Sequence, residues 1–398
     1  MCAKPLVLVV VVGETARAAN WGLNGCARQT TPQRERLGVV NFSDVRSCGT
    51  NTEVSLPCMF APVGRRDCSE ARIRGSESLL HVLARAGVAV HWRDNQSGCK
   101  GVCDGLPNDT VSAVNAPGLC QDGRCLDEGL IHDLDQRLES AKGAQLMVLH
   151  QPGNHGPSYF RRYPPPAFAR HLPECRDDDL RRCSVEEIVN AYDNAILYTD
   201  HLLASTIAKL AAHADKVDSV LLYVSDHGES LGEKGLFLHG VPWAIGPDEQ
   251  TKVPMVMWWS RGLAKGTGVG DACMRATLVE HARQKTSHDH LFHTVLHAGG
   301  RALAALALVV LAADLFRSSA GAPARAQRAY WFAVIALALL PALKRLSLSS
   351  CPWDLAEFGG TAAYVPHGLP GTGDGGPGHC FPSGHAVSAF AFFGLYFL

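Results

Sequence analysis

The sequence of 398 residues lacks an excess of charge of either sign, because 37 basic and 38 acidic side chains leave a net charge of −1. This balance excludes the broad basic surface that is typical of nucleic-acid-binding proteins, so we expect no nucleic-acid partner. Charged residues are scarce after residue 300, where only ten occur. The sequence therefore predicts a charged, soluble body over residues 1–298 and an apolar tail over residues 299–398.

The sequence also lacks a C-x-x-C motif, although it contains 14 cysteines. Eight of them form close pairs in stretches rich in Gly, Pro and Asp: Cys48 and Cys58, Cys99 and Cys103, Cys120 and Cys125, and Cys175 and Cys183. Metal knuckles are one interpretation, but the spacing varies from pair to pair. Disulfides are the other interpretation, and they indicate an oxidising compartment.

The N-terminal region has no long apolar run of the kind that directs export. Residues 5–12 (PLVLVVVV) are apolar over only eight positions, are rich in valine and end in Gly13-Glu14-Thr15. This pattern is typical of a buried parallel strand that enters a loop. We therefore expect a strand here, and export has to depend on something outside this sequence.

Short apolar runs alternate with helical patterns along the body. The predicted strands are 5–12, 87–92, 145–150, 219–225 and 253–258, and the predicted helices are 76–86, 128–141, 184–213 and 286–297. This alternation predicts an α/β fold with a mostly parallel sheet flanked by helices on both faces. Because chemistry in such sheets sits at the carboxyl ends of the strands, four residues are expected to meet at one edge: Glu14, His155, Asp226 and His227.

Two apolar runs in the tail, 302–316 and 329–343, are bounded by charged residues. Flanking residues can extend each run to the roughly 20 residues that cross a bilayer. Three arginines and no acid lie between the runs, so we expect that loop on the cytoplasmic side and the body on the other side. The tail is thus predicted to be a helical membrane segment, and buried helices of a soluble domain are the alternative.

The segment Asp226-His227-Gly228 places a carboxylate beside an imidazole at a predicted strand end, which suits a divalent metal ion. His155 and His239 lie in other loops, each beside a glycine. A single loop histidine is commonly a solvated surface residue. Several such residues at strand ends favour a metal or substrate site.

Thr50 and Thr52 precede a short apolar segment that can begin a helix. One interpretation is an ordinary helix N-cap. The other is a nucleophilic hydroxyl at a helix N-terminus, where backbone N–H groups favour a phosphate and a base or a metal activates the oxygen. The spacing alone leaves both interpretations open.

These motifs together resemble the catalytic domain of the lipid A phosphoethanolamine transferases. This family belongs to the alkaline phosphatase and sulfatase superfamily and includes the colistin-resistance enzymes. The resemblance extends over residues 5–297 and is carried by VGETARAAN (12–20), SCGTNTEVSLPC (47–58), NQSGCKGVC (95–103), HQPGNHGP (150–157), NAYDNAILYT (190–199), YVSDHGESLGEKGLFLHG (223–240) and SHDHLFHTVL (287–296).

The resemblance implies a role for individual residues. Four would form the main zinc site, with Thr52 as the nucleophile that becomes phosphoethanolaminated: Glu14, Thr52, Asp226 and His227. Two would bind substrate phosphate or a second zinc ion: His155 and His239. Four would line the substrate pocket: Asn95, Lys100, Thr50 and Glu229. The metal would favour the Thr52 alkoxide and, with the imidazoles and Lys100, stabilise charge on the phosphoryl oxygens.

Proximity and the resemblance together predict four disulfides: Cys48–Cys58, Cys99–Cys103, Cys120–Cys125 and Cys175–Cys183. The tail resembles the opening of a type 2 phosphatidic acid phosphatase, through Lys344 before Cys351-Pro352 and through FPSGH over 381–385. In that family Lys344 would hold phosphate, and His385, which follows Ser383 in this motif, would be the general acid. The third motif with the nucleophilic histidine would follow Leu398, so we expect an anchor and not a phosphatase.

From these residues we expect an enzyme that uses one zinc ion or two. It would transfer phosphoethanolamine from phosphatidylethanolamine to a phosphate of lipid A through a covalent phospho-Thr intermediate. It would act at the inner membrane of a bacterium, with the body facing the periplasm. The alternatives are a hydrolase of the same superfamily that passes the phosphoryl group to water, and an inactive fragment of a fused or broken gene.

Overall fold

The described part of the chain ends before the apolar tail. The computed structural model describes residues 4–65, 69–114, 118–121, 123–263 and 271–296. The predicted membrane tail, with Lys344, Ser383 and His385, therefore lies outside the described residues. Within the ranges given, no helix combines the length and the apolar character that crossing a membrane requires.

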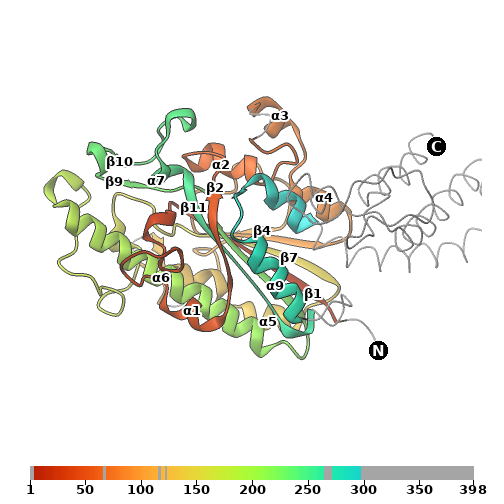
Figure 1. The fold of residues 1–398 in the computed structure, drawn as a ribbon. Coiled ribbons are helices and arrows are strands. Elements are labelled where there is room, and N and C mark those ends of the chain that lie inside the picture. Colours follow the sequence, from red (N-terminus) through yellow and green to blue (C-terminus); the bar gives the residue numbers. More distant parts are fainter. Residues whose placement is uncertain (1–3, 66–68, 115–117, 122, 264–270, 297–398) are drawn as a thin grey trace, which may run out of the picture. The chain divides into compact units, whose positions relative to one another are not determined.

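The described residues form a central eight-stranded sheet in the order β12-β2-β11-β8-β1-β7-β3-β4 (Figure 1). β11 runs antiparallel to both of its neighbours, β8 and β2, and the other seven strands share one direction. The prediction of a mostly parallel sheet is thus confirmed. The strands are β1 (Leu6–Gly13), β2 (Val40–Arg46), β3 (Ala89–Asp94), β4 (Asn108–Thr110), β7 (Ala144–His150), β8 (Asp218–Ser225), β11 (Lys252–Trp259) and β12 (Thr286–Ser287).

β1 lies in the middle of the sheet, where β7 and β8 pair with it on its two sides. Its alternate residues Leu8, Val10 and Val12 pack into one core layer, and the residues between them pack into the layer on the opposite face. Both faces are covered, so β-branched apolar residues suit every position of the strand. This explains why residues 5–12 show a continuous apolar run and no alternation.

Helices cover both faces of the sheet. One core layer contains apolar residues of α5 (Leu134–Glu139) and α6 (Val185–Ala212). The opposite layer contains residues of α2 (Thr52–Met59), α4 (Leu79–Arg85) and the helix over 289–296, and α9 (Asp271–His281) packs against it. Apart from 3-10 turns, the other short elements of the described residues are α1 (Pro32–Leu37), α3 (Glu70–Gly75), α7 (Asp248–Thr251), and the hairpins β5 (Cys120–Gln121) with β6 (Arg124–Cys125) and β9 (Ser230–Leu231) with β10 (Phe237–Leu238).

The predicted helices agree with the structure in two cases and need correction in two. The helix predicted over 184–213 is α6. Ser184 and Glu187 form a capping box at its N-terminus. The helix predicted over 76–86 is the shorter α4. The pattern over 128–141 breaks into a 3-10 turn over Asp127–Ile131 and the short α5. Residues 286–297 begin as strand β12, because Thr286 and Ser287 pair with β2 before the helix starts.

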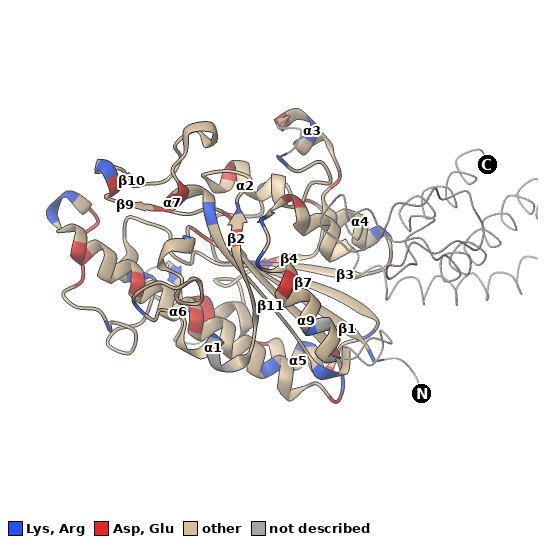
Figure 2. Cartoon of the chain, in the orientation of Figure 1, with Lys and Arg blue, Asp and Glu red and all other residues tan. Residues whose placement is uncertain are grey.

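Charged residues are found mostly in the helices and loops around the sheet (Figure 2). β1 and β7 contain no Lys, Arg, Asp or Glu. An arginine–carboxylate ion pair is nevertheless fully buried, between Arg34 of α1 and Asp200 of α6, with 2.7 Å between Arg34 Nε and Asp200 Oδ1. Asp200 also accepts a hydrogen bond from the backbone N–H of Gln33, and the guanidinium lies 3.9 Å from the ring centroid of Trp21. The pair joins α1 to α6.

We expect Asp200→Asn to lower the free energy of unfolding by about 3–5 kcal/mol, because the change leaves Arg34 as a buried charge without its partner. Urea denaturation followed by circular dichroism measures this loss. Asp215→Asn makes the same chemical change at an exposed position beyond α6 and should alter stability by less than about 0.5 kcal/mol. Equal stability of the two variants would contradict the assigned role of the pair.

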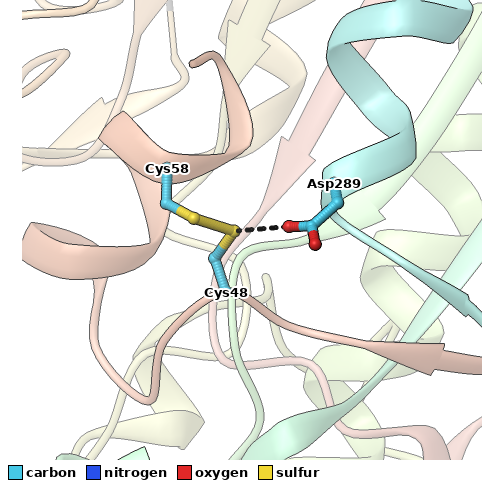
Figure 3. A group of neighbouring side chains, drawn as sticks. All are labelled: Cys48, Cys58 and Asp289. Carbon is cyan, nitrogen blue, oxygen red and sulfur yellow. Dashed lines mark hydrogen bonds between the residues drawn. A yellow bond between two sulfur atoms is a disulfide. The ribbon is translucent and has the colours of Figure 1, made fainter. Parts of the chain in front are cut away.

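The structure contains the four predicted disulfides: Cys48–Cys58, Cys99–Cys103, Cys120–Cys125 and Cys175–Cys183. The first joins the segment before α2 to the helix itself, and Asp289 Oδ1 lies 3.9 Å from Cys48 Sγ (Figure 3). Because the two sulfurs are bonded to each other, this group offers no thiolate to a metal ion. The Asp289 carboxylate accepts a hydrogen bond from the backbone N–H of Arg65 at 2.7 Å.

Mass spectrometry of unreduced peptides should show these eight cysteines in four bridges. Cys26 and Cys273 are free in the structure and should react with iodoacetamide before reduction, which makes them an internal control. Each bridge closes a short loop and should contribute about 2–4 kcal/mol, mainly by restricting the unfolded chain. Free thiols at the eight bridged positions in protein from an oxidising compartment would refute the pairing.

Candidate active site

Two neighbouring parallel strands deliver the central side chains of the site. Glu14 follows β1, and Asp226 and His227 follow β8, whose last residues pair with the end of β1. The three side chains are fully buried, and each offers one ligand atom within 4.8 Å of the others. The predicted convergence at the carboxyl edge of the sheet thus occurs for these three residues.

Thr52 is the first residue of α2 and turns its hydroxyl toward this cluster. Its Oγ1 donates a hydrogen bond to Glu14 Oε2 at 2.9 Å and lies 3.4 Å from His227 Nε2. The helix is capped by Asn51, whose side chain accepts a hydrogen bond from the backbone N–H of Val54 at 3.0 Å. The N-cap interpretation of Thr52 is therefore wrong, and its hydroxyl is available for another role.

Burial and mutual charge shift the pKa values of the cluster. Burial raises the pKa of Asp226, and the nearby Glu14 carboxylate raises it further. Burial by itself lowers the pKa of His227, but the charges of Asp226 and Glu14 and a hydrogen bond to Glu14 outweigh burial and raise it to about 10. Burial raises the pKa of Glu14, but the hydrogen bond and charge of His227 outweigh burial and lower it. The two buried carboxylates thus require a positive charge beside them.

The unsatisfied atoms of the cluster fit a divalent cation. Glu14 Oε1 and Asp226 Oδ2 are buried, and the polar neighbour that they share within the described residues is His227 Nε2, 3.2 Å from the first and 3.4 Å from the second. Nδ1 of His227 contacts the Gly228 carbonyl oxygen at 3.0 Å, which leaves Nε2 facing the carboxylates. Two carboxylates, one imidazole and one hydroxyl form a donor set that suits zinc.

Tight backbone packing holds Glu14 in place. The backbone N–H of Asn154 donates to the Glu14 carbonyl oxygen at 3.0 Å, and a Cβ at Gly153 would lie only 2.9 Å from that oxygen. Thr15 has a φ of 51°, in the left-handed region that non-glycine residues rarely adopt. Its backbone N–H points at Asp226 Oδ1, 3.3 Å away. The strained turn after β1 thus fixes the backbone of Glu14 and orients the Asp226 carboxylate.

A second group of side chains adjoins the first. The rings of His227 and His239 have centroids 4.5 Å apart, and His239 lies 5.5 Å from His155, which follows β7. The buried Glu229 contacts His239 Nδ1 through Oε2 at 2.8 Å and accepts a hydrogen bond from the Tyr159 hydroxyl on Oε1 at 2.7 Å. Both carboxylate oxygens of Glu229 are thus engaged within the protein, and Glu229 orients His239.

Three other predicted pocket residues have protein partners. Thr50 Oγ1 donates to the Val241 carbonyl oxygen at 2.6 Å. Asn95 Nδ2 donates to Asp127 Oδ1 at 3.0 Å, which directs its side chain to that buried carboxylate. Lys100 Nζ lies 3.2 Å from the Ser97 carbonyl oxygen and 3.5 Å from a carboxylate oxygen of Glu53. Direct contact of Thr50, Asn95 and Lys100 with substrate stays a prediction.

Sequence reasoning missed Gln96 and Asp127. Gln96 Nε2 donates a hydrogen bond to Glu14 Oε2 at 2.8 Å. The same oxygen accepts the hydrogen bond from the Thr52 hydroxyl. Asp127 is buried and accepts hydrogen bonds from residues that follow β3 and β7, among them the backbone N–H of Gly153 at 3.3 Å, and burial raises the pKa of Asp127 to about 6. Gln96 lies beside Asn95 in the NQSG motif, but neither residue has a spacing signal of its own.

Comparison with known proteins identifies the family. Residues 7–300 match the sulfatase family. Phosphoethanolamine transferase EptA of Escherichia coli strain K12 is 42% identical over 292 residues, which are 73% of this chain and 53% of that protein. The soluble domain of lipooligosaccharide phosphoethanolamine transferase A from Neisseria meningitidis is 44% identical with a TM-score of 0.70, and the match covers 74% of this chain and 88% of that one.

A more distant structure shows the fold alone. The C-terminal periplasmic domain of EcEptC from Escherichia coli, solved as a complex with Zn, is 22% identical, with a TM-score of 0.61 over 75% of this chain and 83% of that one. The present chain spans about half the length of the curated EptA proteins of Escherichia coli and Salmonella that it matches. The chain belongs to the sulfatase family, and within that family it is similar to the phosphoethanolamine transferases.

Proposed function

We propose that this protein transfers phosphoethanolamine from phosphatidylethanolamine to a phosphate of lipid A in a zinc-dependent reaction, with Thr52 as the nucleophile. The names of the similar transferases support the transferred group, and lipooligosaccharide in one of those names supports the acceptor. The four disulfides support a periplasmic location of the body, and the lipid substrates support a location at the inner membrane.

The observation that carries this proposal is the position of the Thr52 hydroxyl. Oγ1 lies within hydrogen-bonding distance of Glu14 and close to His227, on the first residue of a helix that Asn51 caps. A threonine hydroxyl needs such partners before it can act as a nucleophile. Zinc held by Glu14, Asp226, His227 and Thr52 would supply Lewis-acid stabilisation of negative charge when bound.

The reaction divides into two displacements at the same phosphorus atom. In the first, Thr52 Oγ1 forms a bond to the phosphorus of the donor, and the bond from phosphorus to the diacylglycerol oxygen breaks. The Thr52 hydroxyl gives its proton to Glu14 through the hydrogen bond between them. The departing diacylglycerol oxygen takes up a proton. In the second, a phosphate oxygen of the acceptor bonds to the phosphorus and Thr52 Oγ1 leaves and recovers a proton. His155 and His239 bind the phosphoryl oxygens in both steps.

Product analysis with a donor labelled in its ethanolamine separates the candidate functions. A transferase moves the label to lipid A, a hydrolase releases it as free phosphoethanolamine, and an inactive fragment leaves it on the donor. We expect labelled lipid A when the full chain is supplied with zinc, donor and lipid A in detergent micelles. Free phosphoethanolamine as the main product in the presence of lipid A would favour the hydrolase.

A further inference from the structure

A cavity of about 350 Å³ lies beside the helix that carries Thr52. It is open to solvent on one side and is lined by the C-terminal half of α2, the end of α3 with the residues up to the start of α4, and the loop over 100–104. Figure 1 shows α3 next to α2 at this edge of the molecule. Apolar and basic residues line it together: Pro57, Ala61, Ile73, Val102, Arg74 and Lys100. Glu77 and Asp104 also line it, and Glu77 pairs with Arg85.

The two cations of the cavity both contact the carboxylate of Glu53, the residue after Thr52, which does not itself line the cavity. Arg74 Nη2 lies 3.2 Å from Glu53 Oε1, and Lys100 Nζ lies 3.5 Å from Glu53 Oε2. The Glu53 side chain is 60% exposed, whereas that of Lys100 is only 20% exposed. Ion pairs with an exposed carboxylate are weak, because water and salt screen the charges. Arg74 also pairs with Glu70 at the start of α3, with 2.9 Å between Nε and Oε1. Glu53 is the carboxylate that contacts both cations, and a stronger anion can displace it.

We propose that this cavity binds the phosphate of the acceptor, with Arg74 and Lys100 as its cations and Glu53 as the carboxylate that the phosphate displaces. A phosphate carries more charge than a carboxylate and offers three oxygens, so it satisfies a guanidinium and an ammonium together. The apolar wall gives the adjoining hydrocarbon or sugar face of a lipid acceptor a surface to contact. The inference rests on the proposed function, since it assigns the group that accepts phosphoethanolamine from Thr52.

The experiment measures the two half-reactions separately. The full chain is first incubated with labelled donor alone, and the label on the Thr52 peptide is quantified. Lipid A in detergent micelles is then added, and loss of label from Thr52 is followed with time. For Arg74→Gln we expect normal labelling of Thr52 but an acceptor KM raised about tenfold, because a charge-assisted contact to phosphate is lost. Arg74→Lys should restore part of the affinity.

Glu53→Gln distinguishes a binding role from a structural one. It removes the competing charge and should lower the acceptor KM, whereas a purely structural network would lose function in both variants. Arg181→Gln, at a residue whose side chain is 90% exposed, is the matched control and should leave both half-reactions unchanged. Slower labelling of Thr52 in Arg74→Gln would assign the cavity to the donor and overturn the proposal. Unchanged transfer from labelled Thr52 would overturn it as well, and a wild-type chain without label on Thr52 would overturn the proposed function itself.

Discussion

Thr52→Ala is expected to abolish phosphoethanolamine transfer while the fold persists, because the change removes one hydroxyl and one methyl group at the start of a helix that Asn51 caps. Protein incubated with phosphatidylethanolamine and no acceptor should carry one phosphoethanolamine on the peptide that contains Thr52, and the adduct should be missing from the alanine variant. Mass spectrometry of that peptide measures the adduct directly. A water-soluble donor analogue serves as a second substrate.

Two further variants sharpen this test. Thr52→Ser keeps the oxygen and should retain measurable transfer. Thr277→Ala makes the same chemical change at an exposed position of α9 and should transfer at the wild-type rate. An adduct on Thr50 or Ser55 would move the nucleophile to another residue, and full turnover by zinc-loaded Thr52→Ala would end the mechanism.

Glu14→Gln is expected to remove bound zinc and to lower transfer at least about 100-fold, a loss at the upper end of those known for disturbed metal sites. The substitution keeps the size of the side chain but removes the negative charge and one of the two acceptor oxygens in the cluster. Elemental analysis of the purified protein gives the zinc content independently of activity, and circular dichroism reports the fold.

Glu139→Gln is the matched control for this variant, because Glu139 is exposed at the end of α5. It should keep the zinc content and the rate of the wild-type chain. Chelation of zinc from the wild-type chain should reproduce the loss of transfer, and added zinc should reverse it. Retention of stoichiometric zinc by Glu14→Gln would show that the ion binds elsewhere.

The sequence by itself determined the elements whose cause is local. The run over 5–12 indicates a strand because valines suit a position that is buried on both faces, and the structure has β1 there. Ser184 and Glu187 mark the start of α6 because a capping box needs only residues three positions apart. The cysteine pairs are equally local, since each disulfide joins residues no more than ten positions apart.

The strand ends of the site were also predictable in part. Parallel strands present their carboxyl ends at one edge, so residues that follow β1 and β8 have to lie close together. Glu14, Asp226 and His227 meet for this reason. The direction of β11 was not predictable in the same way, because its apolar run is compatible with either direction and only its position between β8 and β2 decides it.

Only the tertiary structure decided where the loop side chains point. Asn51 and not Thr52 caps α2. The Thr52 hydroxyl instead donates a hydrogen bond to Glu14, 38 positions earlier in the chain. Asn95 turns to Asp127, whereas its neighbour Gln96 reaches Glu14. Adjacent residues in an extended loop point in different directions, and which one meets the site depends on partners that are far away in the sequence. No local pattern encodes that choice, because packing between distant strands and loops sets it.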